Sequence, residues 1–330
     1  MKRKFIIFAP SYSELSGGVI ALHKLCDLLN KSDNEAYLYP MFESYEFHPY
    51  NAHLANLMIQ GWDSTFHVKH TRAFDQVSEL EDQKQFYLIN PEFSAPVLMP
   101  DPNLSFDDQW VIIYPEVTFG NPLRAKNVVR WLLHNPGFHT GKIYYSPNEL
   151  YFRYSNTVNP FSFPGSKTSL LELQILHLPL GYYYKPELEN ERNGTAYCAR
   201  KGGGSPVQHN LEDSILIDGK SHQEVANIFR SVKTFISYDP MTLYSNLAVL
   251  CGCSSVVIPS AGVSETEWQR DPRRHYGVAY GIENISKANA TAHLALEGLV
   301  SIERDSTSLT RQFITQVEEY FYPRDSERLL

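Results

Sequence analysis

The chain has 330 residues, of which 43 % are hydrophobic and 20 % are charged. This length exceeds one typical hydrophobic core, and the composition is that of a folded globular protein, so two domains are predicted. The formal net charge of −8 excludes a general nucleic-acid-binding protein. No apolar run in the sequence reaches the roughly 20 residues that a membrane-spanning helix requires.

The chain begins with the pattern of a βαβ unit. Residues 4–10 (KFIIFAP) are aromatic and β-branched, which predicts a buried parallel strand, and this apolar run is too short for a secretion signal. Gly17 and Gly18 form a turn that opens a predicted helix over 18–32, and residues 35–42 predict a second strand. We therefore expect a cytoplasmic protein that starts with a parallel sheet.

The remainder of the first half predicts three strands and a helix. Buried strands are predicted over 85–92 and 109–117, and each ends in Pro-Glu. Residues 125–137 predict a helix that stops at Asn-Pro-Gly, and the segment 141–155 predicts a strand in its first half. The basic residues of this helix region are Arg124, Lys126 and Arg130. A solvated face, a contact with anionic lipid and a contact with a phosphate-bearing acceptor are all open for them.

A segment with Pro, Gly and then many charges, residues 176–195, predicts a domain boundary. Strands and helices alternate again after it. The predicted strands are 195–200, which runs into a glycine loop, 214–219, 233–239 and 254–260. The predicted helices are 221–232 with Ser221 as N-cap, 240–252 with Pro240 in its first turn, and 308–323.

The sum of these elements is an α/β protein with two domains, each built on a mostly parallel sheet. We place the N-terminal domain at residues 1–180 and the C-terminal domain at 181–330, and we expect the last helix to pack back on the N-terminal domain. Ligands of open α/β sheets bind beyond the carboxyl ends of the strands, so the loops that leave strands hold the candidate site residues.

Two glycine loops are candidates for binding phosphate groups. Gly17 and Gly18 allow close approach of a ligand to a helix N-terminus, although a simple tight turn is equally open. The pattern is not G-x-G-x-x-G and no acidic residue ends the second strand, so a dinucleotide site is weakly supported. Arg200 and Lys201 beside Gly202–Gly204 suit a pyrophosphate, and the alternative is a solvated turn.

A third candidate loop follows the strand predicted over 233–239. Asp239 stands at its end, and the hydroxyl groups of Thr242, Tyr244 and Ser245 follow at the start of the predicted helix. Such a cluster at a helix N-terminus predicts a site for a phosphate or a ribose. The alternative for Asp239 is that it only caps the helix.

These features resemble the GT-B glycosyltransferases. The resemblance is carried by S-G-G-V-I-A-L-H-K-L at 16–25, by L-P-L-G at 178–181, and by Asp239 together with C-G-C-S-S-V-V-I-P at 251–259. It implies two Rossmann-like domains facing across a cleft, with acceptor binding in the N-terminal domain and nucleotide-sugar binding in the C-terminal one. Asp239 falls on the first of two family glutamates and Leu247 on the second, so a hydroxyl from residues 242–245 is expected to replace the second acid.

The resemblance implies a transferase that moves a sugar from a nucleotide-sugar donor to a glycan or lipid-linked acceptor in bacterial surface polysaccharide assembly. Cations and helix N-termini stabilise the leaving diphosphate in this family, so neither a metal nor a cofactor is expected. No nucleic-acid partner is expected, and contact with the inner membrane surface would be peripheral. A nucleotide-sugar epimerase of the same fold and a non-catalytic sugar- or nucleotide-binding partner subunit remain as alternatives.

An inverting enzyme also needs a base for the acceptor hydroxyl. The candidates are Glu14 in the first loop, Glu116 after the strand over 109–117, and His134 in LLHNPG, and each also has a structural or solvated reading. Glu265 is placed near the donor sugar, with a capping box before a short helix as its alternative. Aromatic side chains that suit an acceptor groove are Tyr114, Phe119, Phe138 and Trp268.

Overall fold

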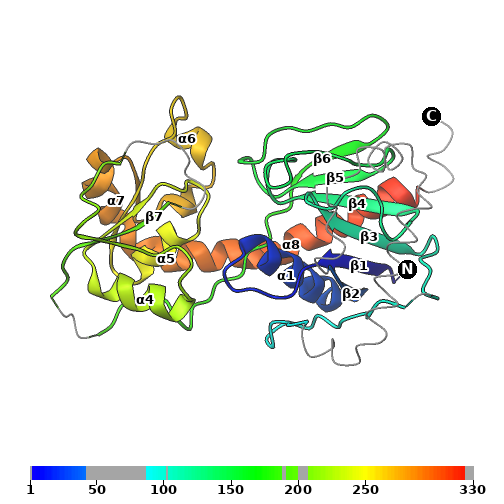
Figure 1. The fold of residues 1–330 in the computed structure, drawn as a ribbon, viewed down its shortest axis with the longest axis horizontal. Coiled ribbons are helices and arrows are strands. Elements are labelled where there is room, and N and C mark those ends of the chain that lie inside the picture. The colour runs from blue at the N-terminus through cyan, green and yellow to red at the C-terminus, as the bar shows by residue number, and fades with distance from the viewer. Residues whose placement is uncertain (1, 42–86, 102, 188–190, 200–206, 324–330) are drawn as a thin grey trace. The chain divides into compact units, whose positions relative to one another are not determined.

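The computed structural model describes residues 2–41, 87–101, 103–187, 191–199 and 207–323 (Figure 1). The chain divides into two compact units. The first unit combines Met1–Leu176 with Ser306–Leu330, and the second unit is His177–Asp305. The first unit is therefore discontinuous in sequence, because its last helix arrives after the whole second unit.

The first unit is built on a sheet of six described strands in the order β2-β1-β3-β4-β5-β6, and all neighbouring pairs are parallel. Its strands are β1 (Lys4–Ala9), β2 (Glu35–Pro40), β3 (Trp110–Pro115), β4 (Asn127–Leu132), β5 (Leu150–Arg153) and β6 (Lys167–Glu172). Helix α1 (Gly17–Lys31) connects β1 to β2. The central strands are aromatic and β-branched because both faces of a parallel sheet are covered.

Alternate side chains of β1 show how the two faces of this sheet are buried. Phe5 and Ile7 lie in one core cluster with the apolar face of α1 and with Phe313 of α8 (Ala295–Phe321). Ile6 and Phe8 lie in a second cluster on the other face. The rings of Phe5 and Phe313 are 6.1 Å apart between centroids. The second half of α8 is therefore part of the core of the first unit.

The second unit is built on a sheet of five described strands in the order β11-β10-β9-β7-β8, again with parallel neighbours. Its strands are β7 (Thr195–Cys198), β8 (Ser214–Leu216), β9 (Thr234–Ser237), β10 (Ser254–Val257) and β11 (Val278–Tyr280). Its helices are α4 (His222–Ser231), α5 (Tyr244–Leu250), α6 (Glu265–Trp268) and α7 (Ile285–Thr291), with short 3₁₀ turns at Pro272–His275, Ile282–Asn284 and Ala292–Leu294. A complete capping box of Ser221 and Glu224 starts α4, as the sequence predicts.

The two sheets share one strand order. In each unit the second strand in sequence lies on one side of the first, and the third lies on the other side. This order creates a topological switch point between the first and third strands, which are β1 and β3 in one unit and β7 and β9 in the other. The predicted α/β class with two Rossmann-like parallel sheets is confirmed. The cleft and the separate acceptor and donor roles of residues 1–180 and 181–330 stay predictions.

The helix predicted over 125–137 is wrong, because this segment contains strand β4. Every residue of β4 is buried, and Val128 and Val129 are β-branched residues that favour a strand. Arg130 interrupts the apolar residues of the segment, as a solvent-facing residue of an amphipathic helix would, but its side chain is fully buried against Glu149. The basic residues at 124, 126 and 130 therefore do not share an exposed helical face.

Two strand predictions in the first half are also wrong. The described part of the segment 85–92, from Tyr87 to Glu92, forms no strand, and the Tyr87 hydroxyl instead donates a hydrogen bond to the Ala9 carbonyl. The strand predicted in the first half of 141–155 lies in its second half, as β5. Asn148 adopts a φ of 63° immediately before it, so the chain turns there before it enters the sheet.

Candidate functional site

A cavity of about 430 Å³ lies in the first unit at the carboxyl ends of β1 and β3. It therefore occupies the switch point of the first sheet, where ligands of this fold bind. Its volume falls in the range of roughly 300–1,000 Å³ that is typical of small-molecule sites. The described residues that line it are Pro10, Ser16, Gly18, Val19, Leu22, Met41, Pro115, Val117, Phe119, Leu133, His139, Thr140, Lys142 and Tyr144.

The start of α1 forms one wall of this cavity. The Ser16 side chain caps the helix by accepting a hydrogen bond from the Val19 amide at 3.5 Å. Gly18 lines the cavity, and a Cβ atom on it would lie 3.4 Å from Leu133. A Cβ atom on Gly17 would meet no heavy atom within 4 Å. The glycines thus leave room beside first-turn amide groups, which have no acceptor within the helix and favour anions.

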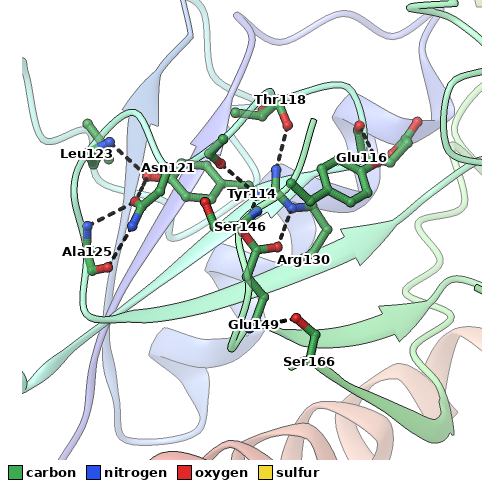
Figure 2. Close-up of polar contacts among 12 residues, drawn as sticks. Tyr114, Glu116, Thr118, Asn121, Leu123, Ala125, Arg130, Ser146, Glu149 and Ser166 are labelled. Atoms are coloured by element: carbon green, nitrogen blue, oxygen red, sulfur yellow. Dashed lines mark hydrogen bonds and ion pairs between the residues drawn. The ribbon is translucent and has the colours of Figure 1, made fainter. Parts of the chain in front are cut away.

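A buried ion pair holds another part of the cavity lining in place (Figure 2). Arg130 donates two hydrogen bonds to the Glu149 carboxylate, from Nε at 2.9 Å and from Nη2 at 2.6 Å. The same guanidinium donates to the carbonyl oxygens of Thr118, at 2.5 Å, and Gly120, at 2.7 Å. These two carbonyl groups flank Phe119, which lines the cavity. Arg130 therefore fixes the backbone that presents this ring.

The positive charge of Arg130 is surrounded by the Glu149 carboxylate and two aromatic rings. The guanidinium carbon of Arg130 lies 4.4 Å from the centroid of the Tyr145 ring and 5.2 Å from that of Tyr114. Burial alone would lower the pKa of Arg130, but the charge and hydrogen bonds of Glu149 raise it. Burial also raises the pKa of both tyrosines, so at neutral pH Arg130 is charged and the two phenol groups are neutral.

The three base candidates of the first unit have structural contacts. The Glu116 carboxylate accepts a hydrogen bond from the Leu133 amide at 3.1 Å, and its backbone carbonyl accepts one from Tyr145 at 2.7 Å. His134 is buried, and its Nδ1 accepts from the Asn135 amide at 2.8 Å. Glu14 is half-buried in the loop between β1 and α1. None of the three belongs to the described residues that line the cavity.

Asp239 lies two residues after the end of β9, at the switch point of the second unit, and it is almost fully buried. Its Oδ1 accepts a hydrogen bond from the Met241 amide at 2.9 Å, and its carbonyl accepts one from the Ser237 hydroxyl at 2.7 Å. A side chain that bonds the amide two residues on competes with helix formation. The helix predicted over 240–252 accordingly starts only at Tyr244, and Asp239 does not cap it.

The three hydroxyl residues after Asp239 have different surroundings. Thr242 Oγ1 accepts from the Tyr244 amide at 3.3 Å. Tyr244 is buried in the core of the second unit, where its ring contacts His222 and Phe229. Ser245 is also buried, and its hydroxyl has no hydrogen-bond partner within the described parts of the chain. Of these side chains, only Thr242 lies in the loop itself.

Arg200 and Lys201 lie outside the described residues. Their neighbour Ala199 ends the described part of this loop and donates its amide hydrogen to Asp218 at 3.1 Å. Asp218 follows β8 and so brings a carboxylate to the same edge of the sheet as Asp239. Asp218 was not predicted as a site residue. An acidic residue after the second strand of a βαβ unit is the signal that points to it, and the first unit lacks this signal.

Glu265 begins α6, and the capping box of this helix is formed by its neighbours Ser264 and Glu267. The Glu265 carboxylate lies 3.1 Å from Nδ1 of His275 and 3.9 Å from Nζ of Lys287. Trp268, in the same helix, donates its indole N–H to the Pro240 carbonyl at 2.7 Å. The aromatic ring predicted for an acceptor groove thus ties α6 to the loop that follows Asp239.

Two negative findings apply to the described parts of the chain. They contain no group of three or more His, Cys, Asp and Glu side chains arranged to hold a metal ion. They also contain no helix with the length and apolar character needed to span a membrane. All four cysteines are buried thiols, and no disulfide is formed among them.

Comparison with known proteins identifies no family. No protein-family model matches the chain, and no curated protein matches it. Among solved structures, the chain is similar to a sucrose-phosphate synthase from Thermosynechococcus elongatus at 10 % sequence identity and a TM-score of 0.45. The alignment covers 98 % of this chain and 100 % of that one. The strand order alone defines the class, which is a two-unit α/β protein with a Rossmann-like parallel sheet in each unit.

Proposed function

We propose that the protein is a glycosyltransferase that moves a sugar from a nucleotide-sugar donor to a glycan or lipid-linked acceptor. The observation that carries this proposal is the repeated strand order, which gives each unit its own switch point. A transferase with two substrates needs two such sites. The resemblance of residues 16–25 and 239–259 to the GT-B family is independent support, because it rests on residue patterns rather than on strand order.

In this proposal the first unit binds the acceptor and the second binds the donor. The cavity beside α1 supplies a pocket for the acceptor. Asp239 contacts the donor sugar, and Arg200 and Lys201 bind its diphosphate. Negative charge grows on the diphosphate as the sugar–phosphate bond breaks, and fixed cations stabilise it without a metal ion. Assembly of bacterial surface polysaccharide, in the cytoplasm and at the inner membrane surface, is the proposed setting.

A non-catalytic partner subunit that binds sugar or nucleotide is the second candidate. The observation that favours it is the contact pattern of the base candidates, since Glu116 and His134 are engaged with backbone amides. The buried positions of Tyr244 and Ser245 point the same way. A binding subunit would keep the pockets and release no nucleotide from the donor, which separates it from a transferase.

The test is a nucleotide-sugar panel with two readouts. Thermal stabilisation reports binding, and release of nucleoside diphosphate in the presence of a glycan acceptor reports transfer. Asp239→Asn keeps the acceptor for the Met241 amide but removes the charge, and it is expected to abolish transfer with little change in folding. Asp213→Asn, which changes an exposed residue before β8, is the matched control. Stabilisation without release of diphosphate in the wild type would favour the binding subunit.

A further inference from the structure

We propose that the cavity of the first unit binds a sugar that carries an anionic group, a phosphate or a carboxylate, and that Lys142 binds this group. The proposal rests on the proposed function, because it names the chemical class of the acceptor. It depends on the lining residues of one unit only, so it does not require any particular arrangement of the two units.

The charge of the lining carries the argument. Lys142 and His139 are the basic residues at the cavity, and no Asp or Glu is present among the described residues that line it. The chain as a whole has 37 acidic and 29 strongly basic residues. The cavity lining, which has basic residues and no acidic one, therefore differs in charge from the chain as a whole. The nearby Glu116 carboxylate is not part of the lining and accepts a hydrogen bond from the Leu133 amide. A pocket whose lining contains a cation and no carboxylate attracts an anion.

Lys142 is available to a ligand. Its side chain is exposed at the cavity and forms no ion pair with any described residue. Its backbone is held in place, because the Thr140 hydroxyl donates to the Lys142 carbonyl at 2.6 Å. The Gly141 amide also donates to the Gly137 carbonyl at 2.8 Å, which closes the preceding turn. A fixed backbone with a free ammonium group is suited to reach a charged substituent.

The rest of the lining suits a sugar ring. Phe119 and Tyr144 pack edge to face with ring centroids 5.3 Å apart. Val19 and Val117 add apolar surface, while Ser16 and Thr140 add hydroxyl groups. A pocket with apolar walls and a few polar groups at fixed positions is typical of sites for small ligands. The ring would pack on the aromatic surface with its charged substituent toward Lys142.

Isothermal titration calorimetry without any nucleotide sugar tests this proposal. The probes are glucose 6-phosphate, glucuronate, inorganic phosphate and glucose, at one ionic strength. We expect one of the two charged sugars to bind at least about tenfold more tightly than glucose, as a charged hydrogen bond provides. The phosphate and carboxylate arms then identify the anion. Tighter binding of inorganic phosphate than of either sugar would overturn the part of the proposal that concerns the ring.

Matched variants locate the binding. Lys142→Gln is expected to weaken binding of the charged sugar about ten- to hundredfold and to leave glucose unaffected. Lys126→Gln is the matched control. Lys126 is an exposed lysine that immediately precedes β4 and pairs with Asp108, and its substitution is expected to leave the affinity for every probe unchanged. Equal binding of all sugars, no binding by any probe, or an unchanged affinity in Lys142→Gln would each overturn the proposal. Transfer to a neutral acceptor would overturn it and leave the glycosyltransferase assignment standing. Binding of a charged sugar without any transfer would support this proposal and contradict the glycosyltransferase assignment.

Discussion

Arg130 and Glu149 form a two-pronged ion pair in the interior of the first unit, and both side chains are almost completely shielded from water. The pair also stabilises the β3–β4 connection, because Arg130 donates hydrogen bonds to the carbonyl groups on both sides of Phe119.

Removing the acidic partner leaves a buried guanidinium unpaired. Glu149→Gln is therefore expected to lower the free energy of unfolding by about 3–5 kcal/mol, measured by urea denaturation. Glu172→Gln is the control, because Glu172 pairs with Arg153 at 3.8 Å in a partly exposed position. It should cost less than about 1 kcal/mol. Equal losses in the two variants would contradict a special role for the interior pair.

Asp27 of α1 gives a pH-dependent prediction. Its buried carboxylate lies 3.2 Å from Lys24 and 2.9 Å from Lys31, and it accepts from the Ser94 amide at 2.9 Å. Burial alone would raise the pKa of Asp27, but these hydrogen bonds and charges lower it below its usual range. Stability from this group is therefore present above the unfolded pKa of about 3.9 and is lost as pH falls through the lower folded pKa.

The comparison of wild type and Asp27→Asn in urea denaturation at a series of pH values checks this. The wild type is expected to lose stability more steeply than Asp27→Asn below about pH 4. Asp108→Asn, at the exposed pair with Lys126, should keep the pH profile of the wild type. Parallel profiles for wild type and Asp27→Asn would contradict a lowered pKa.

Gly277 precedes β11 and has a φ of 76°. A Cβ atom there would collide with the side chain of Val249 and lie 3.1 Å from Cα of Ala292. Gly277→Ala combines this collision with a left-handed backbone, so a loss of more than about 2 kcal/mol is expected. Gly219→Ala has a similar φ of 79° but open space around it, and it should show only the backbone cost of about 1 kcal/mol. Thermal unfolding of the two variants measures the difference.

Ser245 distinguishes a ligand-binding hydroxyl from a core position. Its buried hydroxyl has no partner in the described parts of the chain, so Ser245→Ala is expected to raise the free energy of unfolding by about 1 kcal/mol. If the hydroxyl also binds the donor, the same variant loses part of the stabilisation that a nucleotide sugar provides. Ser255→Ala, at an equally unpartnered hydroxyl in β10, should gain stability and keep the donor response. A destabilised Ser245→Ala variant would show that the hydroxyl has a partner.

Strands β7, β8, β9 and β10 of the second unit could be predicted from the sequence, because each has a short apolar run between polar turns. The same holds for β1, α1, β2 and β3. Strand β11 and helix α7 were not predicted. Strand β4 could not be predicted, since Arg130 interrupts its apolar pattern and is neutralised by a glutamate 19 positions away. Only the folded chain brings these two charges together.

The candidate site was predicted less completely than the fold. Asp239 was predicted to end a strand, but it follows β9 by two residues, and the start of the next helix depends on its side-chain hydrogen bond to the Met241 amide. The residues that line the cavity come from separate segments around α1, β3 and residues 133–144, so no single sequence motif predicts the cavity. Lys142 and His139 have no motif of their own, and only their shared position at the cavity gives them a role.

The discontinuity of the first unit has a consequence for biosynthesis. Phe5 of the first strand packs against Phe313 of α8. Phe313 is synthesised only after the whole of His177–Asp305, so this contact forms late in translation. The second unit is contiguous and is complete in sequence before the first one is. During translation the later half of the chain is therefore free to fold first, while the earlier half keeps an unfinished core that needs protection from aggregation.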